Sequence, residues 1–148
     1  MALRNPDEID GLKVVNGKVN GKIPIEDYYK IRDASVHNAY SDSMTLGKWN
    51  DEGISYLTSA KDNGSMFFDL GDDWGVTKIK FGINDADMFE VFNKPALDDA
   101  ISGGKIICFS HNPELVKYFG SSLEAEWKYL QNRGFTELIQ EGNVWIAK

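Results

Sequence analysis

Short apolar runs of strand length alternate with amphipathic stretches of helix length from about residue 24 to the end of this chain. The strand-like runs are SMTLGKW (43–49), SMFFDL (65–70), KIICFS (105–110), FTELIQ (135–140) and NVWIAK (143–148). Helical periodicity covers 24–34, 53–63, 86–102 and 121–133, and VTKIKF (76–81) fits an additional edge strand. Such alternation is typical of α/β proteins, in which helices connect the strands of a sheet.

The predicted architecture is one small Rossmann-like sheet with flanking helices and a C-terminal antiparallel hairpin, which turns at Glu141-Gly142. With 148 residues, 42% of them hydrophobic, we expect a single domain over residues 23–148. Residues 1–22 are expected to form a lead-in segment with a short hairpin at Asn16-Gly17 or Asn20-Gly21. No apolar run approaches the ~20 residues of a membrane span, and the N-terminus lacks the apolar core of a secretory signal.

Charge and motif content exclude several kinds of site. The 16 basic and 23 acidic residues give a net charge of −7, which disfavours nucleic acid as a partner. Neither His37 nor His111 has a second ligand three or four residues away, so no metal site is predicted. The GxGxxG and GxSxG motifs are missing. Cys108 lies in an apolar run and is expected to be a small buried residue.

The segment from Lys105 to Trp127 is the best candidate for a site. Its strand ends at Ser110 and passes through the polar turn SHNP, and ligands of α/β sheets gather at such strand ends. The following helix has an apolar stripe formed by Leu123, Trp127 and Leu130. Helical geometry places Glu126 nearer this stripe than Glu124. Glu126 is therefore either a boundary residue or a catalytic or substrate-binding acid.

Three further side chains have two interpretations each. Asn93 precedes Pro95 within a helical pattern, so it either caps a second helical segment or meets a ligand at a helix break. Trp49 and Trp74 lie at a strand end and in the loop GDDWG, where the indole ring can face a ligand or the core.

The run of motifs SDSMTLGKW, SYLTSAKDNGSMFFDLG, MFEVFNKPALDDAISGGKIICFSHNP, SSLEAEWKYL and GNVWIAK, over about 24–148, resembles the C-terminal toxin domains of bacterial polymorphic and contact-dependent toxins. The resemblance implies delivery from a secreted or cell-surface parent protein, action in the cytoplasm of a target cell, and a cognate immunity protein as partner.

MFEVFNKPALDDAISGGKIICFSHNP followed by FGSSLEAE is also similar in order to the second half of the ADP-ribosyl cyclase and NAD glycohydrolase family. On that register Glu126 matches the catalytic glutamate of the family and Ser121 the hydroxyl residue before it. The family's nicotinamide-stacking tryptophan falls near Phe92 or Asn93, and its disulfides are missing here.

This second resemblance implies cleavage of NAD, by hydrolysis or cyclisation, with release of nicotinamide and without metal or cofactor. Glu126 would hold the ribose hydroxyls and stabilise positive charge, and Trp49 or Trp74 would stack on nicotinamide. Lys48 or the turn from Ser110 to Asn112 would bind the phosphates of this dinucleotide.

Two other functions stay open. A toxin ribonuclease could use His111 or His37 as its acid–base group. A non-enzymatic binding or immunity-type protein would suit the acidic composition, because an acidic surface can mask a basic site on a partner.

Overall fold

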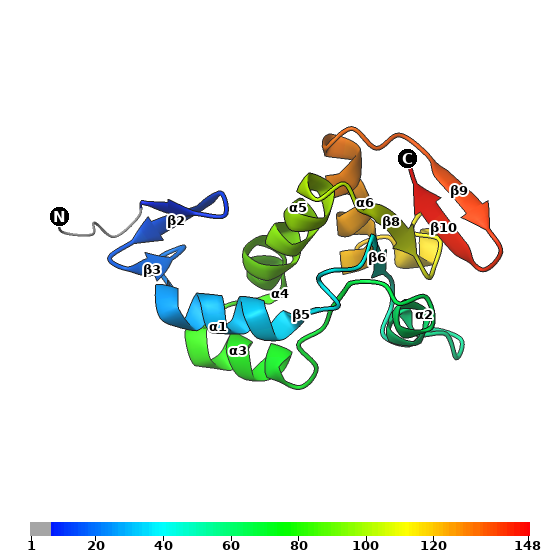
Figure 1. The fold of residues 1–148 in the computed structure, drawn as a ribbon. Helices are drawn as coiled ribbons and strands as arrows, with labels where there is room; N and C mark the ends of the chain where they lie inside the picture. Colours follow the sequence, from blue (N-terminus) through cyan, green and yellow to red (C-terminus); the bar gives the residue numbers. More distant parts are fainter. Residues whose placement is uncertain (1–6) are drawn as a thin grey trace. The chain divides into compact units, whose positions relative to one another are not determined.

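The computed structural model describes residues 7–148, and the chain divides into two compact units, each described separately below (Figure 1). The first comprises the chain up to Val36 together with Asp69–Ala96, and the second comprises His37–Phe68 together with Leu97–Lys148. The described residues form helices together with sheets whose strand pairs are both parallel and antiparallel, which confirms the predicted α/β class. The predicted division into a lead-in, 1–22, and one domain, 23–148, stays a prediction, and residues 1–6 of that lead-in lie outside the described residues.

An antiparallel meander opens the first unit. Its strands are β1 (Glu8–Ile9), β2 (Leu12–Val15), β3 (Lys18–Val19) and β4 (Ile23–Pro24), paired in chain order. Two-residue hairpin turns need left-handed backbone at both central positions, and Asn-Gly pairs supply it most readily. Asn16-Gly17 forms such a turn between β2 and β3. Asn20-Gly21 is also left-handed and lies in the loop of residues 20–22 between β3 and β4, so both turns that the sequence offers as alternatives form.

The first unit continues with α1 (Ile25–Ser35), α3 (Asp73–Phe81), α4 (Asp85–Met88) and a π-helical segment, η1 (Phe89–Asn93). Helix α1 confirms the helix predicted over 24–34. Its Tyr28 is fully buried and stacks on Phe92, with ring centroids 5.6 Å apart. This stacking packs α1 against the π-helical segment.

The edge strand predicted over 76–81 is wrong, because this segment belongs to α3. Asp73 lies in its first turn, and Gly82 ends the helix in a left-handed conformation. The strand-like pattern arose because Val76 and Ile79 are apolar but exposed, whereas the polar Thr77 is buried. Apolar residues on a solvent-facing helix surface thus imitated the alternation of a strand.

The helix predicted over 86–102 forms without a break at Pro95. The π-helical segment lies immediately before α5 (Lys94–Ser102), which contains the proline. Proline has no N–H and crowds the preceding turn, and a wider π turn relieves this conflict. Asn93 therefore lies inside continuous helical backbone and does not cap a second helix.

A four-stranded sheet organises the second unit, with strands β6 (Ser43–Leu46), β8 (Ile106–Phe109), β10 (Val144–Ala147) and β9 (Leu138–Glu141) in that spatial order. β6 and β8 are parallel, and β10 runs antiparallel to both β8 and β9. The last pair confirms the predicted C-terminal hairpin. The short strands β5 (Val36–His37) and β7 (Phe67–Phe68) lie outside this sheet.

Helices α2 (Tyr56–Asp62) and α6 (Ser122–Asn132) and the 3-10 turn η2 (Val116–Tyr118) complete the second unit. The predicted apolar stripe of α6, formed by Leu123, Trp127 and Leu130, is buried. Trp127 meets Phe109 of β8 edge to face at 6.1 Å. Among the described residues, no helix is long and apolar enough to cross a membrane.

Candidate functional site

The candidate site lies where the two parallel strands of the second unit end. Leu46 closes β6 and is paired with Phe109, which closes β8. The chain continues from β6 into Gly47, Lys48 and Trp49, and from β8 into Ser110 and His111. Because the carboxyl ends of parallel strands share one edge, polar residues far apart in the sequence meet here, as in other α/β proteins.

Gly47 allows the two strand ends to approach closely. A Cβ atom built on Gly47 would lie 1.8 Å from Ser110 Oγ, 2.8 Å from Tyr56 Cβ and 3.0 Å from His111 Nδ1. The first two distances are shorter than any van der Waals contact allows. A glycine is therefore required at this position by its neighbours, although its backbone is not left-handed.

His111 is fixed through Nδ1. This atom lies 2.7 Å from Ser110 Oγ and accepts the backbone N–H of Lys48 at 3.3 Å. The ring is only 5% exposed and meets Tyr118 edge to face at 6.0 Å. Its Nε2 has no hydrogen bond of acceptable geometry within the described residues. The backbone of Asp51 and Ile54 is nevertheless close enough to act on the ring.

Burial lowers the pKa of His111, because desolvation disfavours the imidazolium form. The backbone and carboxylate of Asp51 act in the opposite direction. That carboxylate accepts a hydrogen bond from Tyr118 Oη and pairs with Lys117 Nζ at 3.0 Å, and these contacts lower the pKa of Asp51. At neutral pH the site thus holds an uncharged imidazole beside an ionised aspartate.

Glu126 is the buried acid of the site. It projects from α6 and is 7% exposed, and burial raises its pKa to about 8. The positive charge of Lys48 opposes this shift. None of the described residues gives its carboxyl group a hydrogen bond. A carboxyl group so placed is protonated at pH 7 and is available to whatever enters the site.

The neighbouring acid, Glu124, makes contacts at the start of helix α6. Its carboxylate accepts the Gly120 backbone N–H at 3.1 Å and pairs with Lys128 at 3.4 Å. Ser121 caps α6, since its Oγ accepts the Glu124 backbone N–H and donates to the Tyr118 carbonyl at 2.5 Å. The predicted substrate-binding hydroxyl of Ser121 therefore already has structural partners.

The other predicted residues fall in both units. Lys48, Trp49 and Ser110 share the strand edge described above, and Trp49 is 69% exposed, free to receive a ligand ring. Trp74 and Asn93 belong to the first unit. Trp74 Nε1 donates to Asp85 at 2.9 Å, whereas Asn93 Oδ1 is buried and receives no hydrogen bond from residues 7–148. Their roles in a site with Glu126 stay predictions.

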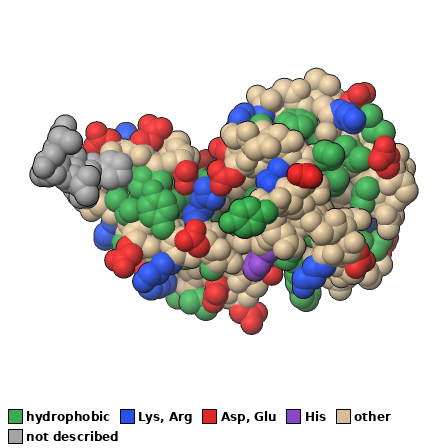
Figure 2. All heavy atoms as spheres, in the orientation of Figure 1, with side chains coloured by type: hydrophobic (Ala, Val, Ile, Leu, Met, Phe, Trp, Pro, Cys, Tyr) green, Lys and Arg blue, Asp and Glu red, His purple; other side chains and the backbone are tan. Residues whose placement is uncertain are grey.

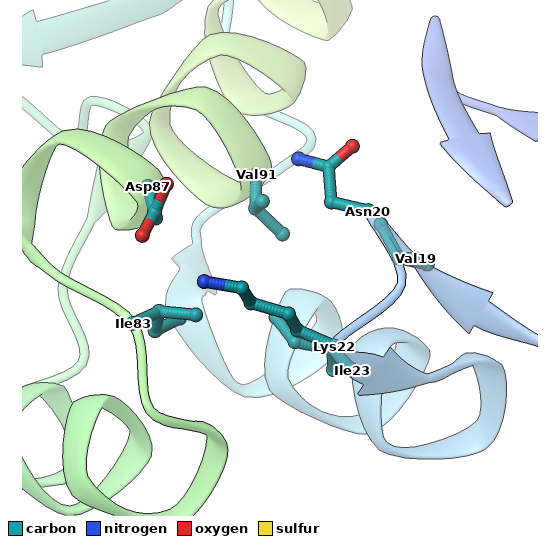
Figure 3. A pocket seen from close by; sticks show the side chains of 7 residues that line it. All are labelled: Val19, Asn20, Lys22, Ile23, Ile83, Asp87 and Val91. Carbon is teal, nitrogen blue, oxygen red and sulfur yellow. The ribbon is translucent and has the colours of Figure 1, made fainter. Parts of the chain in front are cut away.

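A separate small pocket lies within the first unit (Figure 3). Its volume is about 70 Å³, far below the ~300–1,000 Å³ of typical ligand pockets. Its aliphatic lining side chains are buried, and the Lys22 side chain extends among the lining residues (Figure 3). Lining residues are Val19, Asn20, Lys22, Ile23, Ile83, Asp87 and Val91. A dinucleotide does not fit into this volume.

Two features were not predicted from the sequence. Gly47 lies within SMTLGKW, and the sequence does not show its contact with Ser110, 63 residues later. The cluster of Asp51 and Tyr118 around His111 likewise joins distant segments. A glycine inside the strand predicted over 43–49 is the one available signal, because glycine within a strand often marks a close approach of another segment.

On the face drawn in Figure 2, acidic and basic side chains are interspersed without a broad basic surface. Within residues 7–148, no group of three or more His, Cys, Asp or Glu side chains is arranged to hold a metal ion.

The chain was also compared with protein-family models, with curated proteins and with solved structures, and none of them matches it.

Proposed function

We propose that this protein cleaves NAD at its nicotinamide–ribose bond, with Glu126 as the catalytic carboxylate. The observation that carries the proposal is the environment of this side chain. Its carboxyl is almost fully buried, lacks a hydrogen-bond partner in the described residues, and lies within the electrostatic reach of Lys48. Sites of this kind are enriched in catalytic function, because buried charge is costly unless a ligand compensates it.

The charge balance of the site favours a substrate that carries a cation. In the empty protein, desolvation keeps Glu126 protonated, since its pKa is about 8. The nicotinamide ring of NAD is positively charged, and a positive charge within a few ångströms favours ionisation of a carboxyl group. Substrate and carboxylate would thus stabilise each other inside the site. A purely anionic substrate supplies no such compensation.

Electron and proton balance requires no other reagent. The electrons of the C–N glycosidic bond leave with neutral nicotinamide, and the ribose develops oxocarbenium character that the Glu126 carboxylate stabilises. In hydrolysis, water then forms the new bond to ribose C1′ and loses one proton. In cyclisation, an adenine nitrogen of the same molecule forms that bond instead.

Neighbouring residues can supply the remaining contacts. The Lys48 ammonium is suited to the pyrophosphate, and the exposed indole ring of Trp49 is suited to stacking on a planar base. Ser110 Oγ is engaged with His111 Nδ1 at 2.7 Å, so its oxygen is an acceptor for a ribose hydroxyl.

The test is nicotinamide release from NAD by the purified chain, compared with the variants Glu126→Gln and Glu124→Gln. Glu126→Gln retains the shape of the protonated acid but cannot ionise, so turnover should fall ~10²- to 10³-fold. Glu124→Gln preserves an acceptor for Gly120 and should leave turnover within about twofold. Equal turnover by wild type and folded Glu126→Gln would reject this role for Glu126, and an inactive wild type would reject NAD cleavage.

A ribonuclease is the second candidate, because His111, Ser110 and Lys48 meet at one strand edge. A neutral imidazole can act as a general base on a ribose 2′-hydroxyl. Cleaved tRNA or rRNA in cells that express the chain, with unchanged NAD levels, would favour this candidate. The opposite result, depleted NAD with intact RNA, is expected from NAD cleavage.

We further propose that the chain acts as the toxin domain of a delivered parent protein and is neutralised by a cognate immunity protein. The sequence resemblance to polymorphic toxin domains supports this context, and destruction of NAD would make such a domain toxic. Expression in a bacterial host should arrest growth, and Glu126→Gln should relieve the arrest. Harmless wild-type expression would instead favour a non-enzymatic binding protein.

A further inference from the structure

His111 connects the two strand ends of the site through a single ring nitrogen. Nδ1 accepts the Lys48 backbone N–H at 3.3 Å and lies 2.7 Å from Ser110 Oγ. A nitrogen that accepts a backbone N–H carries no proton, so the neutral ring is protonated on Nε2. The single proton of the Ser110 hydroxyl has two acceptors within reach, Nδ1 and the Leu46 carbonyl, which lies 3.3 Å from Oγ.

The contact is built into the local backbone. Gly47 precedes Lys48, and any larger residue there would place its Cβ 1.8 Å from Ser110 Oγ and 3.0 Å from His111 Nδ1. The Ser110 backbone N–H also bonds to the Leu46 carbonyl at 2.8 Å. The chain that leaves β6 is thus held on both sides of Gly47 by the residues that follow β8.

We propose that His111 is a positioning residue: by accepting the Lys48 N–H, its imidazole fixes the main chain at Lys48 and so keeps the Lys48 ammonium close to the Glu126 carboxyl. A lysine side chain has four rotatable methylene groups, so the location of its main chain decides which groups its charge can reach. Lys48 is the residue whose charge acts on Glu126. The inference rests on the proposed function, because it concerns the same site.

Other charges near His111 do not provide this link. Asp51 in the loop after β6 and Lys117 in η2 act on the imidazole, and Tyr118 Oη donates to the Asp51 carboxylate. They pair with one another, with Lys117 Nζ 3.0 Å from the Asp51 carboxylate. His111 therefore joins an ion-paired cluster on one side to Lys48 on the other.

The experiment follows the ionisation of Glu126 directly, by carbon NMR of side-chain carboxyl groups in the full chain. The Glu126 signal is assigned as the one that Glu126→Gln removes. Lys48→Met keeps side-chain length without charge and should raise the titration midpoint. His111→Ala should raise it in the same direction, lowering the acid dissociation constant ~3-fold or more.

Two comparisons separate positioning from general damage. His111→Asn provides an amide oxygen close to the place of Nδ1 and should restore the wild-type midpoint. The double variant Lys48→Met/His111→Ala should titrate like Lys48→Met alone, because an effect that acts through Lys48 disappears without the ammonium. If His111→Ala does not fold, His111→Gln replaces it, since the longer side chain misplaces the acceptor and should raise the midpoint.

The inference is overturned if the titration midpoint of Glu126 in folded His111→Ala equals that of wild type. The same holds for His111→Gln where that variant replaces His111→Ala. A full additional shift in the double variant would overturn it as well. These titrations do not depend on turnover. If the protein does not cleave NAD but the Glu126 midpoint shifts as expected in the variants, the proposed function is rejected and the positioning role of His111 stands. If the protein cleaves NAD but the midpoint does not shift, only the positioning role is rejected.

Discussion

The Glu126 carboxyl group shows how burial sets a protonation state. Its pKa is about 8 in the folded chain and near 4.3 in an unfolded chain. Because the folded pKa is raised, the stabilising effect of the proton is complete below the unfolded pKa and is lost as the pH rises toward 8. Glu126→Gln lacks this titration. The free energy of unfolding of Glu126→Gln minus that of wild type should therefore be larger near pH 8 than near pH 5, by several kcal/mol. Urea denaturation at the two pH values measures this difference. A pH-independent difference would show that Glu126 is ionised in the fold.

Gly47 sets the distance between the two strand ends. Gly47→Ala would force its new Cβ against Ser110 Oγ and Tyr56 Cβ, so Ser110 and His111 must move. We expect ~10²-fold lower NAD turnover, as displacements near 1 Å can have this effect. Gly75→Ala is the matched control, because Gly75 lies in α3 with open space at its Cβ position, and it should retain activity and gain up to ~1 kcal/mol. Unchanged turnover in Gly47→Ala would show that the approach of these strands has no part in catalysis.

At the scale of elements, the N-terminus of α6 has a structural role that the sequence did not separate from substrate binding. The Ser121 hydroxyl accepts the Glu124 N–H and donates to the Tyr118 carbonyl. Ser121→Ala should therefore lower the free energy of unfolding by about 1 kcal/mol, and Ser121→Asp should recover most of it, both measured by urea denaturation. Unchanged stability together with weaker NAD binding in Ser121→Ala would identify Ser121 as a ligand-binding residue instead.

Local patterns predicted most elements, and their failures have physical causes. Helices α1 and α6 and the C-terminal hairpin follow from periodicity and turn residues. The edge strand predicted over 76–81 is instead part of helix α3, and the prediction fails because the apolar Val76 and Ile79 face solvent. Glu126 could be found from helical geometry, since its neighbours along one helix decide its burial. The contact of Gly47 with Ser110 and His111 could not, because it depends on the pairing of β6 with β8.

At the scale of the whole molecule, the net charge of −7 restricts how a phosphorylated substrate is bound. NAD has only one pyrophosphate, so the local charge of Lys48 can suffice, whereas RNA binding releases many counterions and weakens steeply with salt. We therefore expect KM for NAD to change less than about fivefold between ~50 and ~200 mM salt. A decline of several orders of magnitude would indicate a substrate held by many phosphates.

The pH dependence of kcat/KM for NAD decides whether Glu126 acts as a carboxylate, because it reports ionisation of the free enzyme. If the Glu126 carboxylate stabilises the cation, kcat/KM should rise about tenfold per pH unit below pH 8 and level off above it, given a pKa of about 8. Glu126→Gln should lose this dependence along with most of its activity. A wild-type profile that falls as the pH rises through 8 would show that the protonated acid is the active form and would reject the proposed role of the Glu126 carboxylate.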